Sequence, residues 1–595
     1  MASHRAGRLT EAEALYLRVL QVQPRNFEAL RLFAVLSLQR GKPSEALRLI
    51  GRSLEMNPAY AAAWHDRGQI LRALGRNDEA LECYARALAI DPAFVDAIAS
   101  RGQTFGALGR NGEALACFDA MVAAAPGSAQ ALNNRGSALA ALKRYSDALS
   151  DYDKALSLQP RSTAILNNRG LALQALGRDQ EALAAFERAL ILDPTDARTH
   201  NNRGLALQGL DRHENAVGCF DQALALQPGY ADAWNHRAAS LQELRRFKDA
   251  LESYERAIAL APEESWFHWN LGLLLLLLGD FERGWPEYEW RLRTGQVVLQ
   301  RFQQPLWRGE PLNGRTLLIH TEQGLGDTIQ FCRYAPQFAR EGRVILQAPG
   351  PLLGLLERLA LPSRKGVGGW GANLDIAGAT PPRNSLPQGD GERVAVVPTG
   401  DPLPNFDLQC PLLSLAGMKR TASNVPYLFA DPNRVADWRE KIGGEGLKIG
   451  ICWQGNPAVG IDRRRSIPLR HFQAIGRIPG VRLISLQRVY GLDQLTTAPP
   501  ELRIETLDAQ GYESFDDAAA IMMCLDLVVS SDTAIAHVAG ALGRPVWLGT
   551  SYVPDWRWGL EGSACDWYPT MRLFRQTTRG DWLSVFAEMA AALRG

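Results

Sequence analysis

Two hydrophobic patterns divide the chain. In the first half, apolar and small residues recur at helical spacing in two runs per unit, separated by a turn, as in AYAAAWHDRGQILRALGRNDEALECYARALAIDP. From about residue 313, short β-branched runs alternate with helical runs, such as TLLIH followed by TIQFCRYAPQFAR. The first pattern predicts paired helices. The second predicts βαβ units with a parallel sheet.

The first half repeats with a fixed period. Prolines recur every 34 residues, at positions 24, 58, 92, 126, 160, 194, 228 and 262. A small residue follows ten positions after each proline from 58 onward, at Gly68, Gly102, Gly136, Gly170, Gly204, Ala238 and Gly272. We interpret these as positions where two helices approach closely. This period resembles tetratricopeptide repeats, which stack into a superhelix with a concave groove.

An asparagine ladder stands two residues before several of these small residues, at Asn134, Asn168, Asn202 and Asn270. A carboxamide both donates and accepts hydrogen bonds, so a row of them can hold the backbone of an extended peptide. The alternative is that asparagine is merely tolerated on an exposed helix face. Asparagine is a mediocre helix former, so its recurrence in consecutive repeats favours a binding role. The same positions carry peptide-gripping asparagines in the O-linked N-acetylglucosamine transferases, which this half resembles.

A second row consists of arginines, at positions 67, 101, 135, 169, 203 and 237. Acidic residues also recur in register, at positions 79, 113, 147, 181 and 249. Ion pairing within the array therefore explains the arginines better than binding of an acidic partner does. Asp151 and Asp153 form an Asp-x-Asp inside a repeat helix, which is not evidence for a metal-dependent transferase.

We predict four segments. Residues 1–294 form a helical solenoid with an aromatic cap at residues 279–293, and residues 295–312 form a junction. Residues 313–430 and 431–595 form two α/β domains, which face each other across a cleft at the carboxyl ends of their strands. The fold class is thus an α-helical solenoid followed by two Rossmann-like domains.

Two loops of the α/β half carry candidate chemistry. In SSDTAIAHVAGALGRPVWLG, residues 530–549, a helix begins after a strand, and its N-terminus suits either a phosphate or an ordinary cap. In HTEQGLGDTIQF, residues 320–331, two glycines precede Asp327, which sits where a helix N-cap would. That loop by itself fits a catalytic loop, an anion cradle or a turn.

A family resemblance distinguishes these readings. DTAIAHVAGALGRP looks like the nucleotide-sugar-binding segment of GT-B glycosyltransferases, especially heptosyltransferases. EQGLGDTIQF resembles that family's first loop, in which an aspartate is the general base, and WQGNPAVGIDRRRSIPL resembles the loop that reaches the donor phosphates. Heptosyltransferases usually have lysine where this chain has arginines, and they carry no repeat array.

The resemblance implies a role for each matching residue. Asp327 would be the base, on a loop whose Gln323, Gly324 and Gly326 face the acceptor. The donor side would comprise Asp532, Thr533, Ala534, His537 and Arg465, together with Gln454 and Asn456 in a loop after a predicted strand. No metal ligand is implied.

Composition excludes several other functions. The net charge of +1 over 595 residues leaves no electrostatic footprint for nucleic acid, and the eight cysteines form no CxxC pair or zinc pattern. The longest apolar run, 271–278, is too short to cross a bilayer, and no leader pattern follows Met1. We expect a cytoplasmic protein without a membrane span.

These observations predict a metal-independent, inverting GT-B glycosyltransferase that uses a nucleotide sugar as substrate and needs no cofactor. Its partner would be a protein acceptor, held in the repeat groove and glycosylated on Ser or Thr. Flagellin is the candidate acceptor, because the layout resembles bacterial flagellin glycosyltransferases. Two alternatives remain open: a transferase of a polysaccharide or lipid-glycan pathway whose repeats serve assembly, and a non-catalytic repeat scaffold.

Overall fold

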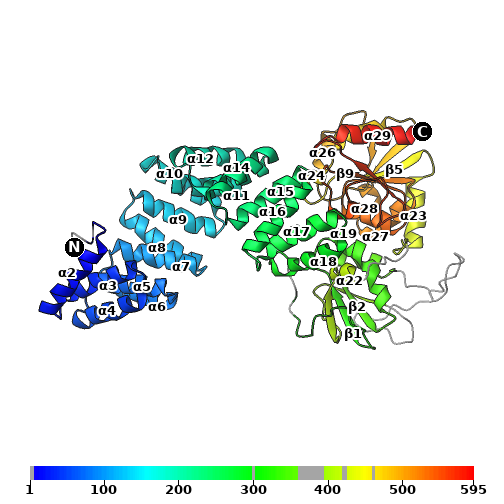
Figure 1. Cartoon of the computed structure of the whole chain (residues 1–595). Coiled ribbons are helices and arrows are strands. Elements are labelled where there is room, and N and C mark those ends of the chain that lie inside the picture. The colour runs from blue at the N-terminus through cyan, green and yellow to red at the C-terminus, as the bar shows by residue number, and fades with distance from the viewer. Residues whose placement is uncertain are drawn as a thin grey trace. The chain divides into compact units, whose positions relative to one another are not determined.

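The computed structural model describes residues 4, 6–297, 300, 302–359, 394–418, 425–458 and 462–595. Parts of the predicted junction, of the first α/β domain and of the loop near residue 460 lie outside these ranges. The chain forms two compact units, Met1–Leu244 and Arg245–Gly595. The helices after residue 244, including the cap, belong to the second unit together with both sheets (Figure 1).

The first unit is a stack of helical hairpins, as the 34-residue period predicts. Each repeat contributes two helices joined by a short turn, and consecutive helices pack against each other. The helices are α2 (Leu9–Val22), α3 (Phe27–Gln39), α4 (Pro43–Met56), α5 (Ala61–Ala73), α6 (Asn77–Ile90), α7 (Val95–Ala107), α8 (Asn111–Ala124), α9 (Ala129–Ala141), α10 (Tyr145–Leu158), α11 (Thr163–Ala175), α12 (Asp179–Leu192), α13 (Ala197–Gly209), α14 (His213–Leu226) and α15 (Ala231–Glu243).

The small residues recur at a regular spacing because each lies where two helices pack closely. A Cβ atom added at Gly136 would lie 2.6 Å from the ring of Tyr152 on the partner helix, and one added at Gly102 would lie 2.7 Å from the ring of Phe118. An aromatic ring therefore occupies the space that a side chain would need. The small residues are packing positions, as the sequence predicts.

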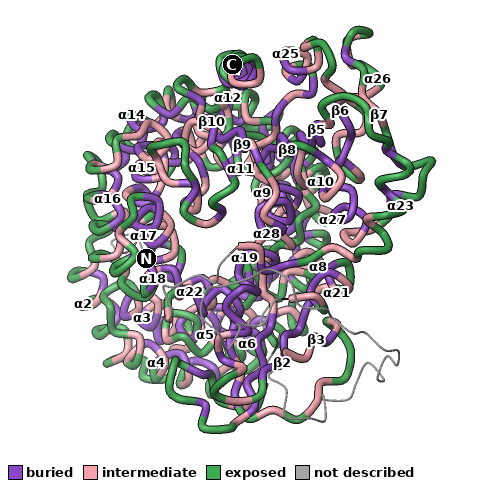
Figure 2. Tube along the Cα trace, turned by 90° about the vertical axis from the view of Figure 1, so that its right-hand side faces the viewer, coloured by how far each residue is buried: buried purple, intermediate pink, exposed green. Residues whose placement is uncertain are grey.

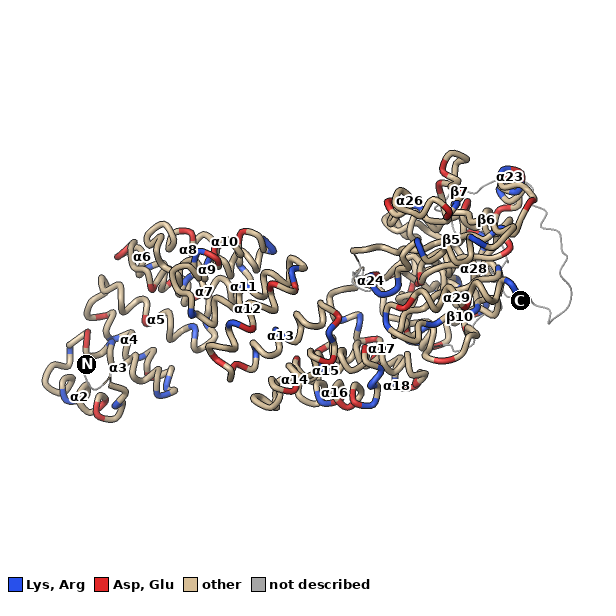
Figure 3. The backbone as a smooth tube through the Cα atoms, turned by 90° about the horizontal axis from the view of Figure 1, so that it is seen from above, with Lys and Arg blue, Asp and Glu red and all other residues tan. Residues whose placement is uncertain are grey.

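Four arginines of the row, at positions 135, 169, 203 and 237, form ion pairs within the array, although with other partners than the acids in register. Arg135 donates to Asp151 at 2.6 Å and Arg169 to Asp153 at 2.7 Å, so both residues of the Asp-x-Asp are engaged. The acids in register instead pair with arginines three residues earlier, as Glu79 does with Arg76. Figure 3 shows the two signs of charge interspersed along these helices.

The second unit begins with helices. They are α16 (Phe247–Leu260), α17 (Ser265–Leu277), α18 (Phe281–Tyr288) and the 3-10 helix η1 (Glu289–Arg293). A Cβ atom at Gly272 would lie 2.5 Å from the backbone nitrogen of Tyr288, so α17 and α18 approach closely. The Arg245 side chain donates to the carbonyl of Tyr552 at 2.9 Å. The turn before α16 therefore contacts the second sheet domain directly.

The first sheet is parallel, with the order β3-β2-β1-β4. Its strands are β1 (Thr316–His320), β2 (Arg343–Ala348), β3 (Val394–Pro398) and β4 (Leu408–Pro411). The helical segments between and after them are α19 (Leu325–Phe331), η2 (Cys332–Tyr334), α20 (Ala335–Phe338), η3 (Gly350–Leu352), α21 (Leu353–Leu356) and α22 (Ser414–Met418).

The second sheet is also parallel, with the order β10-β9-β8-β5-β6-β7. Its strands are β5 (Leu447–Cys452), β6 (Val481–Ser485), β7 (Ile504–Glu505), β8 (Leu527–Ser530), β9 (Val546–Thr550) and β10 (Met571–Arg575). Helical segments are α23 (Pro432–Ile442), α24 (Asp462–Arg465), η4 (Leu469–Phe472), α25 (Gln473–Gly476), α26 (Asp493–Thr496), η5 (Asp508–Gln510), α27 (Phe515–Met523), α28 (Ala534–Ala541), η6 (Trp556–Trp558) and α29 (Trp582–Arg594).

The central strands explain the nearly continuous apolar runs in this half. The strand β8 is buried along its whole length (Figure 2), as a strand covered on both faces must be. The helical solenoid followed by an α/β part with two parallel sheets confirms the predicted fold class. No helix in the described ranges is long and apolar enough to cross a bilayer.

Candidate functional site

Asp327 lies in the first turn of α19, which follows the strand β1. Its carboxylate accepts a hydrogen bond from the backbone N–H of Gly324 at 3.0 Å. Gly324 is the N-cap residue and Asp327 is the third residue of the helix, so the prediction that Asp327 occupies the N-cap position is wrong. Burial raises the pKa of Asp327 above its ordinary value, while Arg557 and the Gly324 N–H act in the opposite direction. Asp327 thus accepts a hydrogen bond at the start of its helix and is also a candidate base.

Arg557 comes from the other sheet domain and pairs with this carboxylate. Its guanidinium also donates to Asp555 at 2.8 Å and to the side-chain oxygen of Gln330 at 2.7 Å. It lies 4.6 Å from the ring centre of Trp556. No role for Arg557 is predicted from the sequence. Its position in a loop after β9, at the carboxyl end of a parallel strand, is the signal that points to it.

The helix start at which the sequence suggests a phosphate site is the first turn of α28. Thr533 is its N-cap residue, and no described side chain caps the helix there. The hydroxyl of Thr533 lies 3.2 Å from that of Ser530 instead. Burial and the neighbouring Asp555 raise the pKa of Asp532 to about 6. The helix start therefore presents a partly buried carboxyl group beside backbone N–H groups.

His537 lies one turn into α28 and is buried. Its Nδ1 lies 3.0 Å from the hydroxyl of Tyr568, and its Nε2 lies 3.9 Å from Asp532. Burial and three nearby arginines hold the pKa of His537 well below its usual range. The imidazole is therefore neutral at physiological pH, and its Nε2 side faces Asp532.

The two loops meet across the domains. A Cβ atom added at Gly326 would lie 2.9 Å from the ring of His537 and 3.8 Å from the Cα of Ala534. Glycine therefore permits α19 and α28 to touch. The structure thereby brings together Asp327 and Gly326 from one sheet domain with Ala534, His537 and Arg557 from the other.

The remaining predicted donor residues divide into two groups. Arg465, in the arginine run of α24 (Figure 3), lies close enough to lower the pKa of Asp532 and of Asp327. The Gln454 side chain instead accepts from Gln494 at 2.9 Å. Asn456 accepts from the backbone of Ala458 at 3.0 Å, in a turn. The described hydrogen bonds of Gln454 and Asn456 stay within the second sheet domain.

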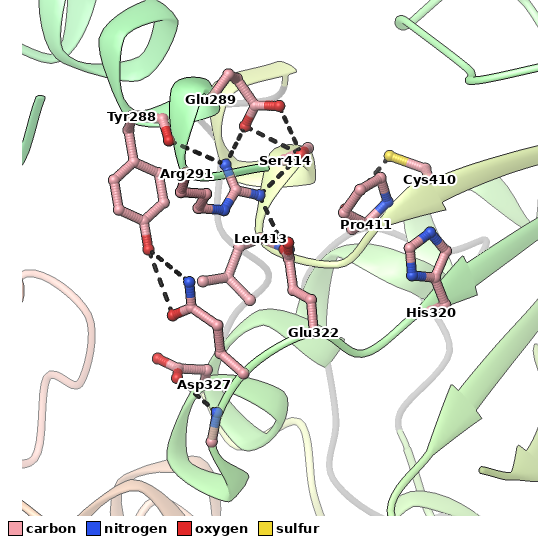
Figure 4. A network of polar contacts seen from close by, with 12 residues as sticks. Tyr288, Glu289, Arg291, His320, Glu322, Asp327, Cys410, Pro411, Leu413 and Ser414 are labelled. Atoms are coloured by element: carbon pink, nitrogen blue, oxygen red, sulfur yellow. Dashed lines mark hydrogen bonds and ion pairs between the residues drawn. The ribbon is translucent and has the colours of Figure 1, made fainter. Parts of the chain in front are cut away.

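On the acceptor side, Gln323 lies within 3.4 Å of the Tyr288 hydroxyl, and Gly324 is exposed. His320 lies apart from Asp327 (Figure 4). It is buried, and its Nε2 lies 2.9 Å from the side-chain oxygen of Gln409. Its pKa is lowered by burial. These contacts are those of a hydrogen-bonded structural histidine.

The asparagine ladder lies on the first helices of its repeats. Asn168 donates to the side chain of Asn133 in the preceding repeat at 2.9 Å, and Asn134 accepts from Gln130 at 2.9 Å. Asn202 and Asn270 occupy the same register and are half-buried. The ladder residues of the first unit are therefore partly accessible, and some of their bonding capacity is used between repeats.

Comparison with known families agrees with this architecture. Tetratricopeptide-repeat models match successive stretches at 4–66, 68–109, 100–163, 144–197, 197–230 and 231–264. A model described as glycosyltransferase family 9 (heptosyltransferase) matches residues 480–547, from the start of β6 into β9. The chain thus combines tetratricopeptide repeats with a glycosyltransferase family 9 domain.

Among individual proteins, Protein FlbA of Caulobacter vibrioides is 31% identical over 337 residues. The match covers 54% of this chain and 54% of FlbA, so the chain spans about half the length of that relative. A tetratricopeptide repeat protein of Parabacteroides merdae is similar at 19% identity and a TM-score of 0.38, over 42% of this chain and 98% of that one. A thermophilic repeat protein of Thermus thermophilus is similar at 26% identity and a TM-score of 0.28, over 31% and 99%.

Proposed function

We propose that the chain is a glycosyltransferase that moves a sugar from a nucleotide sugar to a hydroxyl group of a protein. The observation that carries this proposal is the meeting of Asp327 with the start of α28, His537 and Arg557. These groups come from the carboxyl ends of two parallel sheets, where open α/β folds bind ligands. The glycosyltransferase family 9 match over 480–547 supports the same reading.

In the proposed reaction, Asp327 accepts the proton of the acceptor hydroxyl. The hydroxyl oxygen forms a bond to the anomeric carbon, and the bond from that carbon to the phosphate oxygen breaks with its electron pair on the phosphate. A single displacement of this kind inverts the configuration. Burial makes Asp327 a stronger base, and its pairing with Arg557 favours the ionised form that the step requires.

The departing diphosphate gains negative charge, which the site has groups to stabilise. The N-terminus of α28 presents backbone N–H groups, and Arg465 lies near Asp532. Guanidinium groups bind phosphate through two parallel hydrogen bonds. We propose a metal-independent reaction on the basis of this donor set, with the diphosphate held by Thr533, Ala534, His537 and Arg465.

The acceptor is proposed to be a protein. The asparagine ladder supports this choice, because partly accessible carboxamides in register suit an extended peptide backbone. Ser and Thr supply the hydroxyl group, and flagellin is the candidate on the layout alone. The competing reading, in which the repeats serve assembly of a glycan pathway, keeps the enzyme and changes the acceptor.

Donor binding tests the proposal against a non-catalytic scaffold. A ligand that binds only the folded protein must raise the melting temperature, so UDP, GDP, ADP and their sugars would be screened by thermal shift. At least one should stabilise the full chain, and Asp532→Ala should weaken that effect. Asp526→Ala is the matched control, since Asp526 is half-exposed and pairs with Lys448 elsewhere on the domain. If no nucleotide in this panel shifts the melting temperature, the donor site is wrong.

A further inference from the structure

The cap of the repeat array inserts an arginine into the first sheet domain. Arg291, in η1, is fully buried. Its guanidinium donates to Glu289 at 2.5 Å, to Glu322 at 2.8 Å and to Ser414 at 3.0 Å (Figure 4). It also lies 4.6 Å from the ring centre of Tyr288. Three segments that are distant in sequence therefore converge on one planar cation.

Glu322 is the partner that lies on the acceptor-side loop, between β1 and α19. Its side chain is fully buried. It accepts a second hydrogen bond, from the backbone N–H of Leu413 at 3.1 Å. Burial raises the pKa of Glu322, and Arg291 opposes that rise. Without the arginine, the loop would hold a buried carboxylate with no cation beside it, which is a costly arrangement.

The loop connects this pair to Asp327 within a few residues. After Glu322, the Gln323 side chain lies 3.4 Å from the Tyr288 hydroxyl, and Gly324 then donates to Asp327 at 3.0 Å. The cap thus contacts two consecutive residues of the loop, and the next one bonds to the candidate base.

The cap also contacts the segment that carries Arg557, the ion-pair partner of Asp327. The ring centre of Trp285 lies 5.3 Å from that of Trp556, and the ring of Tyr288 lies 6.3 Å from it. Trp556 precedes Arg557 and stacks on its guanidinium. The cap therefore touches the segments that carry both members of the Asp327–Arg557 pair.

We propose that Arg291 is a positioning residue for glycosyl transfer, whose ion pair with Glu322 fixes the loop that carries Asp327 opposite Arg557. The cap is then part of the transfer site, and its role is not limited to holding the acceptor. A buried ion pair adds little net stability over well-packed apolar residues, so its contribution is to geometry. This inference rests on the proposed function.

The test compares Arg291→Met with Arg283→Met in the full chain. Arg283 lies in the same cap, but its pair with Glu255 is exposed. We expect kcat to fall by about 100-fold in Arg291→Met, as a misplaced catalytic group produces, with the KM for the nucleotide sugar unchanged. Arg283→Met should keep both constants. A wild-type kcat in Arg291→Met would overturn the proposal.

A double variant separates positioning from folding. Arg291→Met with Glu322→Met removes the unpaired carboxylate, so the melting temperature should recover while kcat stays low. If kcat recovers together with the melting temperature, the role of Arg291 is only structural and the proposal fails. The comparison therefore remains informative even when the single variant folds poorly.

Hydrogen exchange distinguishes failure of this inference from failure of the proposed function. In Arg291→Met, amides of residues 321–331 should exchange faster, while those of residues 534–541 keep their protection. This measurement needs no substrate. If wild-type protein turns over none of the nucleotide sugars, the proposed function fails, and the exchange of residues 321–331 alone decides the positioning role. Unchanged protection of that loop would overturn it.

Discussion

The pairing of Arg557 with Asp327 makes a prediction about the pH dependence of transfer. A general base must be ionised, so kcat/KM rises with pH through the pKa of the free enzyme's base. Arg557 lowers the pKa of Asp327, whereas burial and Asp555 raise it. Replacing Arg557 with methionine keeps most of the side-chain volume and removes a guanidinium group in direct ionic contact with the base.

The size of the effect follows from the contact. An opposite charge within about 4–6 Å lowers the pKa of an aspartate by about 1–3. Arg557→Met should therefore raise the pKa of Asp327 by about that amount. Asp555, which loses the same partner, acts in the same direction, because its charge disfavours a second carboxylate nearby. The acidic limb of the profile should move to higher pH.

The assay is kcat/KM for the nucleotide sugar between pH 5 and 9 in wild-type protein and Arg557→Met. Arg572→Met is the control, because Arg572 is half-exposed and pairs with Glu588 away from the site. Its profile should match that of the wild type. An acidic limb that stays in place, or that moves to lower pH, would refute the claim that Arg557 sets the ionisation of the base.

Three further outcomes are expected. Because the pKa of Asp532 is raised from 3.8 to about 6, the folded protein binds its proton more tightly than the unfolded chain, and stability is lost as pH rises from about 4 to 6. Asp532→Asn should remove a loss on the order of 3 kcal/mol, seen as a flatter melting temperature between pH 4 and 7; parallel curves would contradict this. Gly136→Ala should destabilise the repeats by about 1–3 kcal/mol in urea unfolding, since its Cβ would meet a buried ring, and an unchanged midpoint would speak against that packing. Replacing Asn134, Asn168 and Asn202 together with alanine should abolish transfer to a protein and spare a small acceptor; an unaffected protein acceptor would favour the assembly role.

The repeat array could be predicted from sequence in detail because its determinants are local and periodic. The proline spacing, the small residues and the helical runs all report on neighbours within one or two repeats. The ion pairs are harder to predict, since an arginine can have more than one acid within reach, as Arg135 has Asp119 and Asp151. Glu79, which is in register with the row, pairs with Arg76 three residues earlier, while Arg135 reaches Asp151 across the helix hairpin.

The site was predictable only where its residues lie in recognisable loops. The approach of Gly326 to His537 joins two motifs that the sequence had singled out. Arg557 and Arg291 were not singled out, because their significance arises from contacts with residues far away in the chain. The position of Arg557 after a predicted strand is consistent with a place in the site. For Arg291 there was no local signal, since an arginine at the end of a helical repeat is ordinarily a solvated residue.

The most direct test of the central claim is donor turnover in wild-type protein and Asp327→Asn. Both would be incubated with the nucleotide sugar that stabilises the chain best, and release of the nucleoside diphosphate would be measured with water or a protein as the acceptor. We expect the wild type to release the nucleoside diphosphate and Asp327→Asn to release it about 10²–10⁴-fold more slowly. The same nucleotide should still raise the melting temperature of the variant. Equal release by a folded Asp327→Asn would contradict the assignment of Asp327 as the base and with it the proposed reaction.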